Sequence, residues 1–347
     1  MPTHPWHHKI SHHAQLGGIE TSVLDNGLGR GTRIAWINTG TGLRYKIVLD
    51  RAMDIADAFY HQHSLAWLSH AGVTAPQPSS DQGIDWLRTF GGGLLITCGL
   101  THVGGPESDE YGSRGLHGRI SNTPAEIISV IQPNPLAGQL DMSITGRMVQ
   151  TQVFGPTLEL KRTILGRLGE ATIRIQDEVT NLGNTEAPHM LLYHANFGWP
   201  LVDEGAEIVW EGDWRSGGSE GSDAVFHEGN DFRRCPGPQD AHRGTGEAVA
   251  FIDVASGEDG WCTGGIRNRA RGMALRLRFR KEQLPWLINW QHWGPGEYVT
   301  ALEPATHPPI GQAQARREQT LITLAPGELR SYELEFQVLA GEKINQL

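Results

Sequence analysis

The chain has 347 residues, and its 29 lysines and arginines against 39 aspartates and glutamates give a formal net charge of −10. This acidic balance argues against nucleic acid or an anionic membrane surface as a partner, because both bind basic faces. The 44 glycines and 19 prolines indicate many turns, and their irregular spacing between apolar segments argues against collagen and disorder.

The cysteines and the N-terminus set the expected compartment. Cys98, Cys235 and Cys262 lie far apart and have no CxxC spacing, so they predict neither a disulfide framework nor a structural zinc site. The N-terminal stretch lacks the apolar region of a signal peptide, and no segment approaches 18 consecutive apolar residues. We expect a soluble, cytoplasmic protein.

Histidines are concentrated near the N-terminus, at His4, His7, His8, His12 and His13. Pro5 interrupts their spacing, and a chain end rarely supplies the supporting contacts that a metal site needs. We therefore expect residues 1–18 to be a polar leader segment, and we expect no metal or other cofactor.

Alternation of apolar and polar residues with a period of two is the dominant pattern of the chain, and it predicts β-strands with one buried face. In chain order, the strand candidates span residues 32–37, 43–49, 125–131, 141–150, 157–164, 172–179, 206–210, 248–254, 274–281, 298–302 and 332–338. Turn signals separate them, and no long stretch shows the 3.6-residue period of a helix. Strands without alternating helices predict an all-β protein of antiparallel sheets, packed as a sandwich or a barrel.

Three long segments, residues 72–90, 101–118 and 212–246, do not fit strands. Long loops in compact domains are often functional. No flexible linker or fixed repeat divides the chain, so residues 1–347 are expected to form a single domain.

Residues 91–106 are glycine-rich, but they contain neither GxGxxG nor a P-loop lysine, so nucleotide binding is not expected. In residues 115–126, His117 lies between two glycines and is followed by Arg119 and Asn122. Imidazole, guanidinium and amide groups together can bind several sugar hydroxyls. A tight turn with a capping histidine explains the same residues equally well.

The segment YHANFGWP follows an apolar strand. His194 and Asn196 have the parity of Leu192, so in a strand all three side chains point to one face. A polar pair on an apolar face is either a satisfied core network or a functional site.

Glu303 lies at the end of the predicted strand 298–302, directly before Pro304. A carboxylate there is costly to bury unless it is paired, so Glu303 is a candidate for a perturbed pKa. Trp286, Trp290 and Trp293 precede it, and tryptophan rings suit either sugar faces or core packing.

With these segments, the chain resembles the aldose 1-epimerase (galactose mutarotase) superfamily, and most closely its uncharacterised aldose-epimerase-like branch. LHG at 116–118 is similar to the family's LHGG segment, which supplies a substrate-binding histidine. YHANFG at 193–198 resembles NHxYFN, which supplies the catalytic histidine. ALEPATHPP at 301–309 resembles LExQxxPD, which supplies the catalytic glutamate. The match covers roughly residues 20–340 in family order.

The departures from the family pattern concern the sugar-binding positions. Arg119 replaces the second glycine of LHGG, and Ala195 replaces the aromatic residue after the histidine. Glu247 is the nearest counterpart of the family's substrate-binding aspartate. Arg51 is the nearest candidate for the sugar-binding arginine, and a structural pair with Asp54 explains Arg51 equally well.

The resemblance implies a large antiparallel β-sandwich, the galactose mutarotase-like supersandwich, and interconversion of the α and β anomers of an aldose. In this scheme Glu303 takes the C1 hydroxyl proton and His194 protonates the ring oxygen, with His117, Arg119, Glu247 and Arg51 as substrate-binding residues. The implied partner is a small sugar. Arg119 would also suit an acidic or phosphorylated sugar, because a guanidinium group binds carboxylate and phosphate with two hydrogen bonds. The alternatives are a non-catalytic sugar-binding module and another sugar epimerase or lyase on the same fold. The oligomeric state is not predicted.

Overall fold

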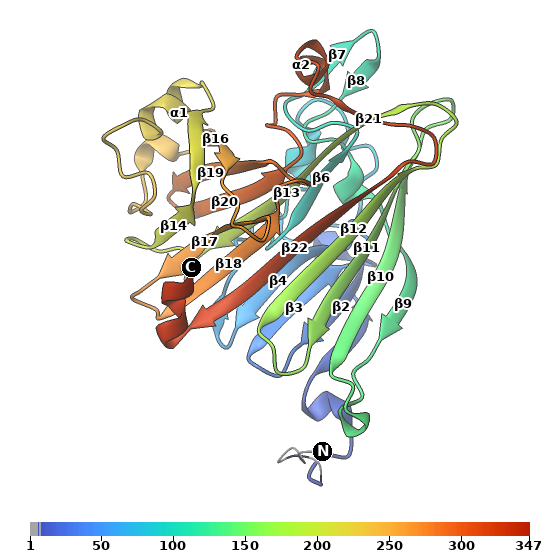
Figure 1. The fold of residues 1–347 in the computed structure, drawn as a ribbon, viewed down its shortest axis with the longest axis vertical. Helices are drawn as coiled ribbons and strands as arrows, with labels where there is room; N and C mark the ends of the chain where they lie inside the picture. The colour runs from blue at the N-terminus through green and yellow to red at the C-terminus, as the bar shows by residue number, and fades with distance from the viewer. Residues whose placement is uncertain (1–5, 7) are drawn as a thin grey trace.

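The computed structural model describes residues 6 and 8–347, and antiparallel sheets make up most of it. Three large sheets of five, eight and seven strands form the body, and a two-stranded hairpin lies beside them (Figure 1). The longest helical segments span six residues. This confirms the predicted all-β class.

The five-stranded sheet has the order β1–β2–β3–β4–β5. Its strands are β1 (Gly18–Val23), β2 (Arg33–Asn38), β3 (Leu43–Val48), β4 (Asp54–Tyr60) and β5 (His63–Ser64). The eight-stranded sheet has the order β14–β17–β18–β22–β12–β11–β10–β9. Its strands are β9 (Glu126–Ile131), β10 (Asp141–Gln150), β11 (Leu158–Arg167), β12 (Thr172–Asn181), β14 (Glu207–Trp210), β17 (Trp261–Asn268), β18 (Met273–Arg280) and β22 (Leu329–Ala340).

The seven-stranded sheet has the order β15–β16–β19–β20–β13–β21, and β6 also pairs with β13. Its strands are β6 (Ile96–Leu100), β13 (Ala187–Gly198), β15 (Gly212–Ser216), β16 (Ala248–Val254), β19 (Trp286–Gly294), β20 (Glu297–Ala305) and β21 (Ile322–Leu324). The hairpin consists of β7 (Glu107–Asp109) and β8 (Gly112–Arg114). The α-helices are α1 (Glu220–Val225) and α2 (Gln312–Arg317), and the short 3₁₀ helices are η1 (His13–Gln15), η2 (Gly27–Gly29), η3 (Asp85–Arg88), η4 (Ile120–Asn122), η5 (Pro135–Ala137), η6 (Asp240–His242) and η7 (Gly341–Gln346).

All eleven predicted strands coincide with strands of the structure, within a few residues at their ends. Two of the three segments predicted to lack strands do contain them, which corrects that expectation. Residues 101–118 include the hairpin β7–β8, and residues 212–246 begin with β15 and continue into α1. These strands are short and partly exposed, so they carry no apolar alternation that a sequence pattern can detect.

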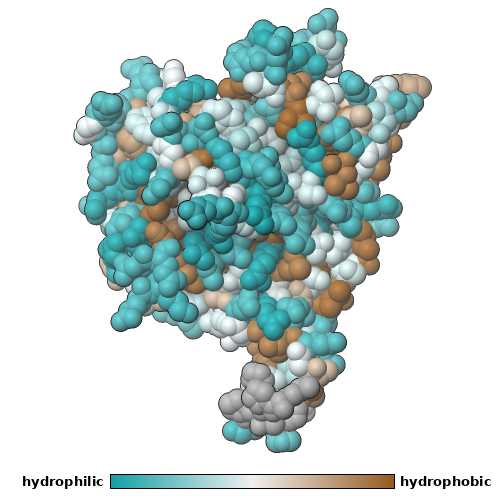
Figure 2. Space-filling view, in the orientation of Figure 1, coloured by the Kyte–Doolittle hydropathy of each residue, from teal (hydrophilic) through white to brown (hydrophobic). Residues whose placement is uncertain are grey.

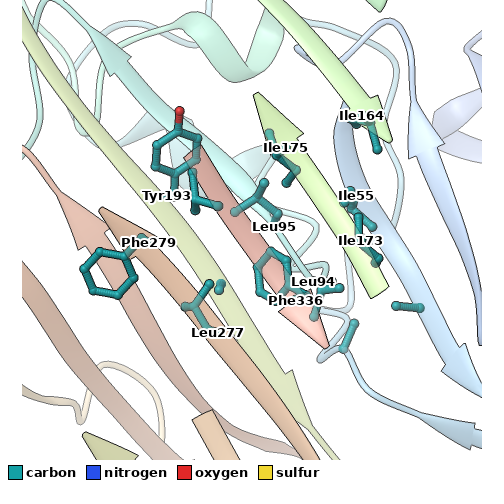
Figure 3. Close-up of a cluster of buried hydrophobic side chains, with 14 of the residues drawn as sticks. Ile55, Leu94, Leu95, Ile164, Ile173, Ile175, Tyr193, Leu277, Phe279 and Phe336 are labelled. Atoms are coloured by element: carbon teal, nitrogen blue, oxygen red, sulfur yellow. The ribbon is translucent and has the colours of Figure 1, made fainter. Parts of the chain in front are cut away.

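The main hydrophobic core contains side chains from all three large sheets. Figure 3 shows part of it, including Ile55 of β4, Ile175 of β12, Leu277 of β18 and Tyr193 of β13. A second, smaller cluster lies around Phe90, and it also includes side chains of β6, β13 and β19. The seven-stranded sheet is therefore covered by apolar side chains on both faces.

The surface in view in Figure 2 is mainly hydrophilic, and its hydrophobic patches are small and separate. Among the described residues, no helix has the length and apolar content to cross a membrane.

Candidate active site

Strand β13 carries two chemically different faces. Leu191 and Tyr193 belong to the main core, whereas Leu192 belongs to the second cluster. Because consecutive side chains of a strand point to opposite faces, His194 and Asn196 lie on the face of Leu192, as their spacing predicts. An imidazole and an amide thus interrupt the apolar face of the second cluster.

Glu303 lies on β20, the neighbouring strand. The antiparallel register pairs Ala195 with Leu302, which places Glu303 next to His194 across the two strands. His194 Nε2 lies 3.3 Å from Glu303 Oε1. The two residues are only 6% and 3% exposed. They form a buried pair of one imidazole and one carboxyl group, which we call the His194–Glu303 pair.

Aromatic rings form the walls around the His194 imidazole. The ring centroids of Phe90, Trp290 and Trp86 lie 5.2, 5.6 and 6.3 Å from it. Trp67 contacts both Phe90 and Trp290, at centroid distances of 5.8 and 6.3 Å. Such walls exclude water and present apolar ring faces, which suit the C–H faces of a sugar.

Burial determines the protonation of the pair. It lowers the pKa of His194 to about 3, and the nearby His117 acts in the same direction while Asn196 opposes it. Burial also raises the pKa of Glu303 well above its ordinary value, and the charge of Glu247 raises it further. Burial therefore favours the uncharged form of each group, with a proton on the Glu303 carboxyl group and a free lone pair on the imidazole.

His117 faces the same site from the loop that precedes η4. Its ring lies 6.3 Å from that of His194 and 5.0 Å from that of Trp86. Burial lowers its pKa to about 3, and His102 contributes to the shift. Its backbone has a φ of 56°, in the left-handed region that residues other than glycine seldom adopt.

The structure also brings Glu247 to the edge of the site. Glu247 precedes β16 and is exposed, and its Oε2 accepts a hydrogen bond of 2.7 Å from the Trp290 indole N–H. Of the other tryptophans expected near Glu303, Trp293 lies in the main core and Trp286 packs against the second cluster. Trp290 thus links Glu247 to the wall beside His194.

Arg51 and Arg119 lie outside this group of residues. The buried Arg51 guanidinium donates to the backbone carbonyls of Ser121 and Thr89 and to Thr74, so its donors hold three loops together. Asp54, which sequence suggested as its partner, instead forms an ion pair of 3.1 Å with Arg162. Arg119 donates to the carbonyl of Thr151 and lines a separate cavity. This geometry favours a structural role for Arg51.

A buried polar network lies directly beneath the site, and the sequence analysis missed it. The Tyr193 hydroxyl donates to Asp177, which forms an ion pair of 2.6 Å with Arg162. Arg162 also pairs with Asp54, which accepts hydrogen bonds from the backbone and hydroxyl of Thr97. Arg162 has the parity of Leu160 and Ile164, and Asp177 has the parity of Ile175, so the alternation puts both charged side chains on the buried face. This parity is the signal that could have revealed the network.

The walls Trp67, Trp86 and Phe90 were also missed, because they come from irregular segments. Their nearest signal in the sequence is the presence of three large aromatics within or beside the long loop 72–90. Long loops of this kind often build functional sites.

Among residues 6 and 8–347, no group of three or more histidine, cysteine, aspartate or glutamate side chains is arranged to hold a metal ion. His4 and His7 of the N-terminal histidines lie outside the described residues. His12 Nδ1 accepts a hydrogen bond from the Ala14 backbone at the start of η1, and the rings of His12 and His13 stack at 4.4 Å.

Solved structures share this fold. A candidate aldose 1-epimerase from Klebsiella pneumoniae aligns with 96% of this chain and 88% of its own, with a TM-score of 0.85 and 21% identity. A galactose mutarotase-like protein from Clostridium acetobutylicum aligns with 93% of this chain and 98% of its own, with a TM-score of 0.60 and 11% identity. Galactose 1-epimerase from Lactobacillus acidophilus aligns with 93% of this chain and 99% of its own, with a TM-score of 0.58 and 12% identity.

At these identities the structural likeness shows the fold alone, and it confirms the expected galactose mutarotase-like β-sandwich. The search of curated proteins gives no match. Residues 29–338 match the model of a family described as a domain of unknown function, DUF4432. That match covers most of the sequence, and the chain therefore belongs to the DUF4432 family.

Proposed function

We propose that this protein is an aldose 1-epimerase, an isomerase that interconverts the α and β anomers of a sugar. The observation that carries the proposal is the buried His194–Glu303 pair, with 3.3 Å between Nε2 and Oε1, on a mutarotase-like fold. One of the structural neighbours is named galactose 1-epimerase, so the same fold occurs in a protein named for this reaction.

Anomer exchange requires ring opening, rotation about the C1–C2 bond and closure on the other face. Opening moves one proton from the C1 hydroxyl and one proton onto the ring oxygen, so it needs one base and one acid. In our assignment Glu303 is the base and His194 is the acid. Groups of this kind typically contribute about 10²–10⁴ in rate.

The pair holds the one transferable proton that this scheme needs. In our scheme the pair starts with its proton on Glu303, the form that burial favours, and transfer from Oε1 to Nε2 across the 3.3 Å contact makes the reactive form. The imidazolium then protonates the ring oxygen while the carboxylate takes the C1 hydroxyl proton. This returns both groups to their neutral forms, so neither is consumed, and closure reverses the transfers.

The remaining polar groups suit the other hydroxyls of the ring. His117 faces the pair and Glu247 lies beside Trp290, and these two are our substrate-binding residues. We assign Arg51 to support of the loops that carry Trp86 and Phe90, and Arg119 to the neighbouring cavity. We also propose that the chain is a single domain, because one hydrophobic cluster joins all three large sheets.

The test is exchange NMR between the anomers of several aldoses, with the parent protein and the variants Glu303→Gln and His194→Asn. Each variant is close in size to the parent residue, and each is expected to lose about 10²–10⁴ of the acceleration. The double variant is expected to be hardly slower than either single variant, because the two groups act as a unit. Glu297→Gln is the matched control, since Glu297 starts the same strand β20 six residues away and ion-pairs with His292 at 3.6 Å.

Circular dichroism checks that each variant is folded. A folded Glu303→Gln variant with parental exchange rates would refute the assignment. Saturable sugar binding without faster exchange would identify a non-catalytic sugar-binding module. A product of changed mass, or deuterium incorporated at carbon, would identify a different sugar epimerase or a lyase.

A further inference from the structure

A cavity of about 460 Å³ lies on the other side of the loop that carries His117. It is lined by α2, the hairpin β7–β8, the loop between β10 and β11, and the residues before β13. Figure 1 shows α2, β7 and β8 together at one end of the molecule, next to β21. Its volume lies in the range typical of small-molecule sites, roughly 300–1,000 Å³.

The cavity is distinct from the His194–Glu303 pair, because residues 115–119 separate the two. The His117 ring contacts Trp86 and faces His194, whereas Gly115, Gly118 and Arg119 line the cavity. The separating loop is tightly packed at Gly118, where a Cβ atom would lie 2.4 Å from the Gly99 carbonyl oxygen. This loop therefore turns a histidine to one side and an arginine to the other.

Three arginines line the cavity, and they differ in how their charge is neutralised. Arg114 is committed to Glu107 and Asp109, at 2.7 and 2.6 Å. Arg119 has a longer contact of 3.9 Å with Asp81. Its charge is therefore less fully neutralised than that of Arg114.

Arg316 interacts with the charge of Asp109, but from beyond ion-pair distance. Its Nη2 donates to Gln312 Oε1 at 2.9 Å, and its guanidinium lies 4.0 Å over the Tyr111 ring. Its Nε is buried and has no hydrogen-bond partner among the described residues. None of the ion pairs found among residues 6 and 8–347 includes Arg316. Arg316 lines the cavity, so the remaining part of its guanidinium is available to pair with an anion bound there.

The rest of the lining limits the ligand that fits. The side chains of Tyr111 and Phe154 both line the cavity and are exposed to solvent, so two aromatic rings lie at the rim of the cavity. Asp81 and Glu186 also line the cavity, and their charge opposes a polyanion. Gln150 and Gln312 supply amide groups at the wall. The combination suits a small ring with hydroxyl groups and one anionic group.

We propose that this cavity binds a small anionic carbohydrate, a sugar phosphate or a sugar acid, with its anionic group at Arg316 and Arg119. A guanidinium fork suits both phosphate and carboxylate. The site is separate from the proposed reaction, because ligand binding here requires neither His194 nor Glu303. The proposal therefore stands or falls independently of the epimerase activity.

The test is isothermal titration calorimetry of the full chain with glucose 6-phosphate, glucuronate, inorganic phosphate and glucose. We expect saturable binding of at least one sugar anion and much weaker binding of glucose. Arg316→Gln and Arg119→Gln are each expected to weaken the anion by about tenfold or more, as loss of a charge-assisted contact does. Which of the two sugar anions binds more tightly distinguishes phosphate from carboxylate.

Arg317→Gln is the matched control, because Arg317 is the next residue of α2, is exposed, and does not line the cavity. Its affinity is expected to equal that of the parent. Glu303→Gln locates the ligand: unchanged affinity places it in the cavity, and lost affinity places it at the catalytic pair and overturns the proposal. Equal affinity in the parent and Arg316→Gln, or no saturable binding of any sugar anion, would also overturn it.

Discussion

His189 allows a sharp test of how burial controls protonation in this molecule, independently of the proposed reaction. It lies on β13, is completely buried, and is held between the Leu100 carbonyl at 3.0 Å and the Tyr332 hydroxyl at 2.7 Å. A carbonyl can only accept, so Nδ1 carries the hydrogen and Nε2 accepts from Tyr332. A second proton on Nε2 would require the Tyr332 hydroxyl to turn and accept it, and it would place a charge on a completely buried ring.

The size of the effect follows from the pKa difference. Burial lowers the pKa of His189 to about 3, and the charges of Arg330 and His307 act in the same direction. An unfolded histidine titrates near 6.5, so between pH 6.5 and pH 3 the unfolded chain binds a proton that the native state does not. Stability from this residue is therefore complete above pH 6.5 and is lost as the pH falls. Between pH 7 and pH 5 the loss is about 2 kcal/mol, at about 1.4 kcal/mol per pH unit below 6.5.

The perturbation is His189→Gln, and the assay is urea unfolding followed by tryptophan fluorescence at pH 5, 6 and 7. Between pH 7 and pH 5 the parent is expected to lose about 2 kcal/mol more stability than the variant, because glutamine does not titrate. The other buried histidines titrate in both proteins and cancel in the difference. Tyr332→Phe is the control: it removes the same hydrogen bond but keeps the histidine, so its cost should not vary with pH. Equal pH dependence in the parent and His189→Gln would refute the reasoning.

Three further predictions concern the core and the site. The Cys98 thiol is fully buried, and burial raises its pKa, so we expect iodoacetamide to label it only in urea; labelling of the native protein at the rate of a free thiol would contradict this. Arg162→Met is expected to destabilise the protein by about 3–5 kcal/mol in urea unfolding, because it leaves the buried Asp177 without its cation; a cost below about 1 kcal/mol would show that the network is not charged. Exhaustive EDTA treatment is expected to leave anomer exchange unchanged, and loss of activity restored by a divalent ion would disprove this.

The strands that the sequence predicts are those with one face in the core and one in solvent. β12 and β22 alternate for this reason, and their bounds were close to the predicted ones. β6 and β13 are buried on both faces, so they carry no alternation, and β6 was not among the eleven predicted strands. A strand that is buried on both faces gives no alternating pattern in the sequence. In this protein β13, one of these buried strands, carries His194.

For the site, sequence reasoning placed His194, Glu303, His117 and Glu247, and the structure brings these four together. Their positions follow from strand parity and from family order, both of which are properties of the chain. The destination of a long side chain is set by tertiary packing, which explains why Arg51 and Arg119 were assigned alike but lie apart. Arg51 is buried among backbone carbonyls, and Arg119 crosses to the carbonyl of Thr151.

The buried network and the candidate site share one strand, and this links the stability of the core to the direction of the His194 side chain. Tyr193 and Thr97 are partners in the β13–β6 register, and the next pair along the strands is His194 with Ile96. On the core side, Tyr193 bonds to Asp177 and Thr97 bonds to Asp54, and both carboxyl groups meet at Arg162. These contacts fix β13 against the opposite sheets one residue before His194. Because a strand turns consecutive side chains to opposite faces, fixing Tyr193 in the core also fixes the direction in which His194 leaves the sheet toward Glu303. The charged network on the core side of β13 thus sets the arrangement of the His194–Glu303 pair, whereas the aromatic rings on the other side determine which molecules can approach it.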